Sequence, residues 1–204
     1  LMKENFIPHG KVTAIFTVQE EIGLVGSKNI EEKYLQDIDF GYTFDADGEA
    51  GHVFTAGPSH YAMKFTFHGK AAHAGMEPEK GLNAIAMAAK AIASCPSGRI
   101  DEETTCNIGL IEGGSGTNIV PEKCIVKGEI RSYSHEKATR CVEEVGNTFK
   151  KVAEKHGAES ELTCEVHLIA YETAKDSVPV KRFERVSKEL GLAGELVETF
   201  CGSD

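Results

Sequence analysis

The chain is short of positive charge. Its 204 residues include 22 Lys and Arg against 32 Asp and Glu, for a formal net charge of −10. Nucleic-acid binding needs a basic surface to neutralise phosphates, and anionic membranes attract basic segments, so we expect neither as a partner. Long hydrophobic runs are also missing, since none approaches the roughly 20 residues of a transmembrane helix. With 26% charged and 41% hydrophobic residues, the composition is that of a soluble globular chain and not of a disordered one.

Several common short motifs are absent as well. None of the six cysteines forms a C-x-x-C pair, and no H-E-x-x-H pair of histidines occurs. The glycine-rich run at 113–116 lacks the Lys of a phosphate loop, which argues against nucleotide binding. Four of the cysteines lie within apolar strand-like or helix-like patterns. We interpret the cysteines as reduced, mostly buried thiols of a cytoplasmic protein.

The middle of the chain predicts a complete domain at 58–171. Four segments have the alternating or β-branched pattern of strands, and two have the spacing of amphipathic helices. In chain order they read β-α-β-β-α-β, which is typical of a ferredoxin-like unit with an antiparallel four-stranded sheet. The predicted strands are 60–68, 104–112, 123–132 and 160–170, and the predicted helices are 81–94 and 135–156, with Gly157 ending the second.

The flanks at 1–57 and 172–204 predict an incomplete α/β domain. Strands are expected at 11–18 and 39–45, with a helix at 27–34 between them, which is the pattern of a parallel βαβ unit. A third strand is expected at 52–56, and the tail predicts a helix near 180–191. The fold class is therefore α+β, with one domain inserted into another. Because the chain starts at Leu1 without an initiator Met, we expect a piece of a longer protein.

Carboxylates follow both predicted parallel strands. Glu20 and Glu21 come after the first, and Asp45 ends the second. Carboxyl ends of parallel strands share one sheet edge, where one carboxylate can bind a cation while its neighbour handles a proton. Asp47 is less favoured, because the strand pattern ends at Asp45. An ordinary solvated Glu pair and an Asp-Gly turn remain the alternatives.

Two further candidates lie in the predicted inserted domain. His73 is flanked by small residues, so its imidazole is uncrowded and could donate a hydrogen bond to a developing oxyanion. Arg131 ends a predicted strand and could clamp a carboxylate with two parallel hydrogen bonds. Taken singly, a surface-loop His and a sheet-edge Arg are the simpler interpretations.

Taken together and in order, these segments resemble the co-catalytic zinc exopeptidase family, which contains peptidase T, carboxypeptidase G and acylase-like amidohydrolases. The likeness to peptidase T-like tripeptidases adds residues 7–10 and the FDADG text at 44–48. The segments are TVQEEIG at 17–23, FD at 44–45, HAG at 73–75, NIVP at 118–121 and GEIRS at 128–132.

The resemblance implies roles for the residues of the flanks. Glu20 resembles the general base, which deprotonates a zinc-bridging water and later protonates the leaving amine. Glu21 and Asp45 each resemble a ligand of one of two zinc ions per full-length subunit, with cobalt or manganese as alternative metals. The family also uses an upstream H-x-D motif and a downstream His, neither of which this chain contains. We therefore expect the chain alone to be inactive.

The inserted domain resembles the lid of this family, through which we expect a homodimer. His73 resembles the lid histidine that stabilises the oxyanion, in some relatives across a dimer interface. Asn118 and Arg131 resemble the lid residues that hold substrate polar groups, with Arg131 on a carboxylate. The expected activity is aminopeptidase cleavage of short peptides. An acyl-amino-acid amidohydrolase, a carboxypeptidase or a non-catalytic dimerisation or binding module are the alternatives.

Overall fold

The computed structural model describes residues 4–6, 8–46 and 48–203. By its internal contacts the chain divides into two units, 1–45 with 203–204, and 46–202. We describe each unit by itself. None of the helices in the described ranges combines the length and hydropathy needed to cross a bilayer.

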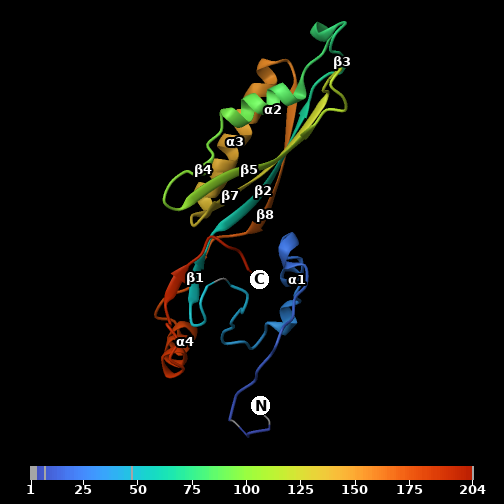
Figure 1. Ribbon diagram of the computed structural model, residues 1–204. Helices are drawn as coiled ribbons and strands as arrows, with labels where there is room; N and C mark the ends of the chain where they lie inside the picture. The colour runs from blue at the N-terminus through green and yellow to red at the C-terminus, as the bar shows by residue number, and fades with distance from the viewer. Residues whose placement is uncertain (1–3, 7, 47, 204) are drawn as a thin grey trace. The chain divides into compact units, whose positions relative to one another are not determined.

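The second unit is built on a five-stranded antiparallel sheet, here called the lid sheet (Figure 1). All four predicted strands are present, with ends within two residues of those expected. A two-residue strand adds a fifth member at one edge. In spatial order the strands are β4 (Gly98–Arg99), β5 (Thr104–Gly113), β7 (Lys123–Ser132), β2 (Ser59–His68) and β8 (Glu159–Leu168).

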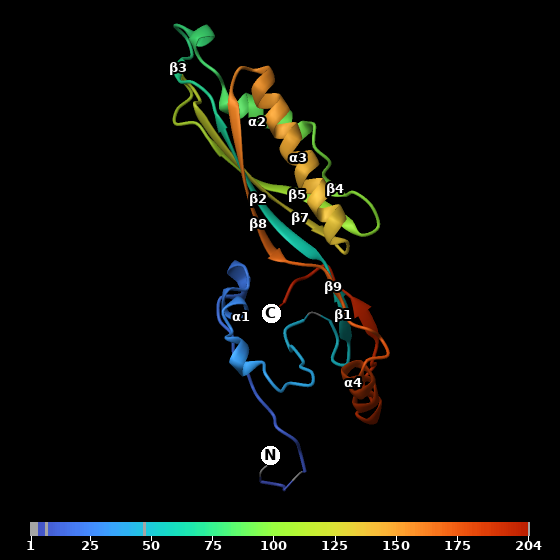
Figure 2. The ribbon, with the colours of Figure 1, turned by 180° about the vertical axis from the view of Figure 1, so that it is seen from behind.

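Two helices cover one face of the lid sheet, as both Figure 1 and Figure 2 show. They are α2 (Ala84–Ala93) and α3 (His135–Lys155), which confirms the predicted helices. Each begins at a side-chain cap, because Asn83 and Ser134 accept the backbone N–H three residues on, at 2.9 and 3.3 Å. Gly157 follows α3 with φ +68°, the left-handed conformation that glycine adopts without strain.

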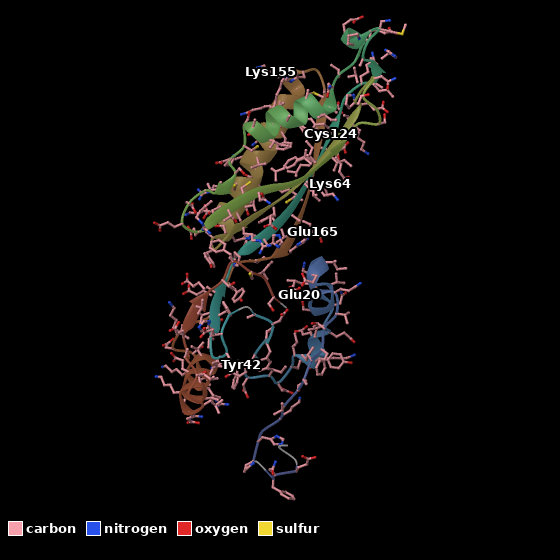
Figure 3. All side chains as sticks on the ribbon, viewed as in Figure 1. Glu20, Tyr42, Lys64, Cys124, Lys155 and Glu165 are labelled. Carbon is pink, nitrogen blue, oxygen red and sulfur yellow. The ribbon has the colours of Figure 1, made fainter. Side chains whose placement is uncertain are left out.

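The core of the lid sheet follows from the period of two along β2. Its odd-numbered residues point to the helices and its even-numbered residues to the open face, where Lys64 lies (Figure 3). Phe65 and Phe67 are 1% and 0% exposed, and both contact Phe149 of α3. The ring centroids lie 3.8 Å apart for Phe65–Phe149 and 5.5 Å apart for Phe67–Phe149. Each such buried side chain contributes about 1.5–3 kcal/mol.

A smaller sheet adjoins residues 58–171, a segment that we name the lid. Its central strand β1 (Val53–Gly57) confirms the strand predicted at 52–56, and pairs in parallel with β10 (Leu196–Glu198). On its other side β1 pairs antiparallel with β9 (Tyr171–Glu172), and α4 (Val178–Glu189) follows β9. Gly57 lies opposite Tyr171, and a Cβ atom on this glycine would lie 2.5 Å from the tyrosine ring. The strands leading into and out of the lid are therefore direct neighbours.

A two-stranded ladder extends the lid beyond the end of β2. It pairs β3 (Ala72–His73) with β6 (Ile119–Val120), and the short helix η3 (Pro78–Lys80) follows β3. Figure 1 and Figure 2 show β3 at the end of the lid opposite to β1. The chain leaves β2 at Gly69, where a Cβ atom would overlap the carbonyl oxygen of Leu82.

The first unit differs from its predicted form. The strands predicted at 11–18 and 39–45 are wrong, because neither range is in a strand, and their parallel pairing is therefore also wrong. The predicted helix at 27–34 is replaced by two short pieces. The elements of this unit are η1 (Glu20–Ile22), α1 (Val25–Lys28) and η2 (Glu32–Tyr34).

The physical reason lies in what parallel strands require. A parallel strand is buried on both faces and takes hydrogen bonds from neighbours on its edges. Phe16 and Phe44, from the two predicted strands, are instead 93% and 87% exposed. Nothing in the described first unit covers these apolar side chains, so the intrinsic strand preference of the two segments is not enough to form a ladder.

Candidate functional site

Glu20 lies in a compact loop that folds back on the segment before it. Gln19 has left-handed backbone angles, with φ 61°, and Glu20 then begins η1. The carbonyl of Glu20 accepts the Leu24 N–H at 2.9 Å, and the Val18 carbonyl accepts the Gly26 N–H at 2.9 Å. A Cβ atom on Gly26 would overlap the Val18 backbone, so this close return depends on glycine. The loop thus fixes the backbone at Glu20.

The three predicted catalytic-domain carboxylates all belong to the first unit. Glu20, labelled in Figure 3, is half-buried, whereas Glu21 and Asp45 are exposed. Asp47 lies outside the described residues. Within the described ranges, no three His, Cys, Asp or Glu side chains gather in a way that could hold a metal ion. A zinc site takes at least three protein ligands, so the described residues do not by themselves fit a zinc centre.

His73 and Asn118 lie side by side at the tip of the lid. His73 is on β3, and the next residue, Ala74, donates its N–H to the Asn118 carbonyl at 2.9 Å. The Nδ1 atom of His73 accepts the N–H groups of Gly75 and Met76, each at 3.2 Å. A neutral imidazole that accepts at Nδ1 carries its proton at Nε2. The exposed His73 is therefore held as a hydrogen-bond donor, the form suited to an oxyanion.

Arg131 occupies the other end of the lid sheet and is already engaged. It lies on β7 directly opposite His60 of β2. Its Nε and Nη2 atoms donate to the two carboxylate oxygens of Glu129, each at 3.1 Å. Its Nη1 atom donates to the Phe200 carbonyl at 2.7 Å. This bidentate pair is the strong, geometrically fixed form of an Arg–carboxylate contact.

His60 extends the network around Arg131. Its Nε2 atom lies 3.0 Å from Glu129 Oε2, and its ring packs edge-on against His167 with centroids 4.9 Å apart. Burial lowers the pKa of His60, the Arg131 charge adds to this, and Glu129 opposes both. Burial would raise the pKa of Glu129, but Arg131 and His60 outweigh it and hold that pKa below its usual range. At neutral pH the network is a carboxylate, a guanidinium and a neutral imidazole.

The lid also holds the side chain of Phe200. The Phe200 ring lies 4.6 Å from the Tyr133 ring, and the Arg99 guanidinium lies 4.7 Å from the Phe200 ring centroid. Both the carbonyl and the ring of Phe200 are therefore bound by the second unit. Residues 201–203 follow immediately, and Asp204 lies outside the described residues.

The structure thus brings some predicted residues together and separates others. His73 adjoins Asn118, but Arg131 sits opposite His60, at the start of β2, while His73 follows the end of that strand at His68. Eight residues at about 3.3 Å each place these two ends about 26 Å apart. An extended tripeptide spans only about 11 Å. One short peptide cannot contact both His73 and Arg131 of the same chain.

Sequence reasoning missed the partners of Arg131. Glu129 lies in the GEIRS segment at 128–132, where only Arg131 was given a role. Side chains two residues apart on a strand point to the same face, so this spacing was the signal that could have paired Glu129 with Arg131. His60 and Phe200 became visible only with the strand register and the tertiary fold.

Comparison with known proteins relates the chain to the M20 peptidases. Residues 58–157 match the model of the M20 peptidase dimerisation domain. A tripeptidase from Staphylococcus aureus subsp. aureus mu50 superimposes with a TM-score of 0.93 at 36% identity, over 99% of this chain and 54% of its own. Aminopeptidase PepT from Bacillus cereus ATCC 10987 gives a TM-score of 0.87 at 38% identity, over 99% and 54%.

A curated relative of unassigned function extends the match to the whole chain. The Bacillus subtilis (strain 168) protein YqjE is 38% identical over 204 residues, which are 100% of this chain and 55% of that protein. The chain therefore spans about half the length of these relatives. Residues 58–157 of the chain therefore match the dimerisation domain of the M20 peptidases, and the chain as a whole is similar to a tripeptidase and to an aminopeptidase.

Proposed function

We propose that the intact protein is a metal-dependent exopeptidase that releases the N-terminal residue from tripeptides and other short peptides. The observation that carries this proposal is the match over 99% of the chain to a tripeptidase and to an aminopeptidase, at 36% and 38% identity. The alternatives within the family, an amidohydrolase and a carboxypeptidase, share the same site residues and are separated by the substrates tested below.

We assign residues 58–171 to a ferredoxin-like lid, and residues 1–57 and 172–204 to parts of a catalytic domain. The strand order β5-β7-β2-β8, with both helices on one face, supports the ferredoxin-like assignment. The direct pairing of β1 with β9 supports an insertion, because the chain leaves and rejoins one small sheet. A cytosolic location is part of the same proposal, and the six cysteines, all described and none in a disulfide, favour it.

Glu20 is the proposed general base. Its carboxylate takes a proton from the attacking water and returns it to the amine that leaves, so the residue ends each turnover unchanged. Half-burial and the fixed loop around it suit this role, since a base must be held within hydrogen-bond reach of its proton. We assign Glu21 and Asp45 as contributors to a zinc site that also takes ligands from beyond the described residues.

His73, Asn118 and Arg131 are the proposed lid contributions to the substrate. The Nε2–H group of His73 would donate to the oxygen that gains charge, and Arg131 would bind a carboxylate. Because His73 and Arg131 lie about 26 Å apart along the lid sheet, we assign them to different sites. Each site then combines residues of two copies of the protein, and a homodimer is part of the mechanism.

The surface that suits this dimer is the β8 edge of the lid sheet. β8 is the outermost strand on that side, and Leu162 on it is 40% exposed. An open groove of about 470 Å³ lies between α3 and β8, lined by residues that include Gly146 and Leu162. An edge strand next to an open groove is a template for pairing with a second copy. The match of residues 58–157 to a dimerisation domain favours the same occupant.

The test uses the intact protein that contains this chain. Glu20→Gln should lower turnover of a tripeptide by about 10²- to 10⁴-fold, because it removes the base and keeps the shape. Glu32→Gln, an exposed carboxylate of the same unit, is the matched control and should leave turnover unchanged. Unchanged turnover in Glu20→Gln would overturn the catalytic proposal and favour a binding module.

Substrate and assembly are tested in parallel. The tripeptide should be cleaved, whereas the matching N-acetyl amino acid should not, and a peptide with a blocked C-terminus should be cleaved more slowly. Preference for the acetyl compound would instead indicate an amidohydrolase. The 204-residue chain alone should show no peptidase activity, and measured activity would contradict that expectation. A monomer mass in light scattering at high concentration would contradict the dimer.

A further inference from the structure

The hydrogen bonds of Arg131 leave a defined part of its guanidinium open. The group has five N–H donors, one on Nε and two on each terminal nitrogen. Glu129 occupies the Nε donor and one Nη2 donor, and the Phe200 carbonyl occupies one Nη1 donor. One donor therefore remains on each terminal nitrogen. Two such donors match the two oxygens of a carboxylate.

We propose that Glu129 is a positioning residue, which holds Arg131 by one edge so that its two terminal nitrogens are presented to the C-terminal carboxylate of the peptide. This inference rests on the proposed function, in which Arg131 binds a substrate carboxylate. It assigns a role to Glu129 that is separate from the Arg131 role. Glu129 does not touch the substrate; it acts through the orientation of the guanidinium.

The position of Glu129 is itself well determined. Its side chain lies on the same sheet face as Arg131, two residues away on β7, so the two approach without any change in backbone. His60 contacts the same Glu129 oxygen that accepts from Nη2, with Nε2 at 3.0 Å. The Arg131 and His60 side chains are only 25% and 20% exposed. One contact along β7, from Arg131, and one from the neighbouring β2, from His60, therefore limit the rotamers of Glu129.

Phe200 fixes the guanidinium from the other side. Its carbonyl accepts from Nη1 at 2.7 Å, and its ring is held between Tyr133 and Arg99. A guanidinium held by a carboxylate on one side and by a carbonyl on another cannot rotate freely. Loss of Glu129 would remove two of the three contacts and would release Arg131 to other rotamers, so less of the protein would be ready to bind the carboxylate.

The experiment compares a tripeptide with its C-terminal amide in the intact protein. The readout is the ratio of kcat/KM for the acid to kcat/KM for the amide, which reports recognition of the carboxylate. Glu129→Gln should lower this ratio about tenfold, mainly by raising KM for the acid, with kcat changed by less than about twofold. The Gln amide offers one acceptor where the carboxylate offered two, so the side-on bond pair cannot form. Glu129→Asp keeps both acceptors and should recover part of the ratio.

Control variants separate this inference from the proposal on which it rests. Glu136→Gln removes a carboxylate whose side chain is 82% exposed on α3, and it should leave the ratio unchanged. If Arg131→Ala leaves the ratio unchanged, the proposed role of Arg131 fails. If Arg131→Ala abolishes the preference for the acid over the amide but folded Glu129→Gln keeps the wild-type ratio, only the positioning role is overturned. A cooperative thermal unfolding transition shows that a variant is folded. If Glu129→Gln does not fold, Glu129→Asp and His60→Ala replace it. A wild-type ratio of kcat/KM for acid over amide in both of these variants overturns the positioning role.

Discussion

Truncation of Phe149 should destabilise the lid more than any surface change of the same size. Phe149 is 0% exposed and stacks on Phe65, with ring centroids 3.8 Å apart, while also contacting Phe67 at 5.5 Å. A buried Phe→Ala change costs about 3–5 kcal/mol, because it removes apolar contacts and leaves a cavity. The lost ring contacts, each worth about 0.5–1.5 kcal/mol, place this site in the upper half of that range. We expect Phe149→Ala to lose about 4 kcal/mol.

Urea unfolding followed by far-ultraviolet circular dichroism measures this loss. The chain contains no tryptophan, so the helix signal of α2 and α3 is the better probe of the lid. With a dependence on urea of about 2 kcal/mol per molar, the midpoint should fall by about 2 M. A domain of ordinary stability, about 5–15 kcal/mol, retains a folded state after such a loss only if it started well above the lower limit.

Phe16→Ala is the matched control, because the same atoms are removed from a side chain that is 93% exposed. It should change the free energy of unfolding by less than about 0.5 kcal/mol. A loss below about 1.5 kcal/mol for Phe149→Ala would refute the packing argument. An equally large loss for Phe16→Ala would show that the first unit buries this ring, contrary to the structure described here.

Three further results are expected. The folded pKa of Glu129 lies below its ordinary value of 4.5, so the stabilisation it provides is complete above pH 4.5 and is lost as the pH falls through the folded pKa. Glu129→Gln should therefore make the unfolding midpoint depend less on pH in the acid range. An unchanged pH dependence would count against the network. Gly69→Ala should cost at least about 2 kcal/mol in chemical denaturation, because its Cβ meets a backbone carbonyl, whereas Gly109→Ala meets only a side-chain amide at 3.4 Å and should be tolerated. In the native chain a thiol reagent should modify the exposed Cys164 quickly and the buried Cys106 only after unfolding, and equal rates would contradict the described core.

Elements that satisfy their own pattern could be predicted from the sequence. The alternation along residues 60–68 fixed both the strand and the face that carries Phe65 and Phe67, because a period of two needs no knowledge of the partner strands. Helix α3 was equally clear, with Ser134 before it and Gly157 after it as local start and stop signals.

Elements that depend on distant neighbours could not be predicted in this way. Residues 11–18 have a strand-like composition, but composition does not supply the hydrogen-bond partners and covering helices that a parallel strand needs. The site shows the same limit. The Arg131–Phe200 bond joins residues 69 positions apart, and the His60–Arg131 pairing depends on strand register. The residue types and their chain order indicated candidate chemistry, while their grouping depended on the tertiary fold.

The pairing of β1 with β9 has a consequence for the order of folding. Gly57 and Tyr171 are direct neighbours, so the whole lid is a loop of roughly 110 residues closed at its base, and closing a flexible loop of that length costs about 4 kcal/mol of chain entropy. A folded lid brings its own two ends together and removes most of this cost. The small sheet should therefore assemble only after the lid has folded. Mutations deep in the lid, such as those at Phe149, would then weaken pairing in a sheet that they never touch.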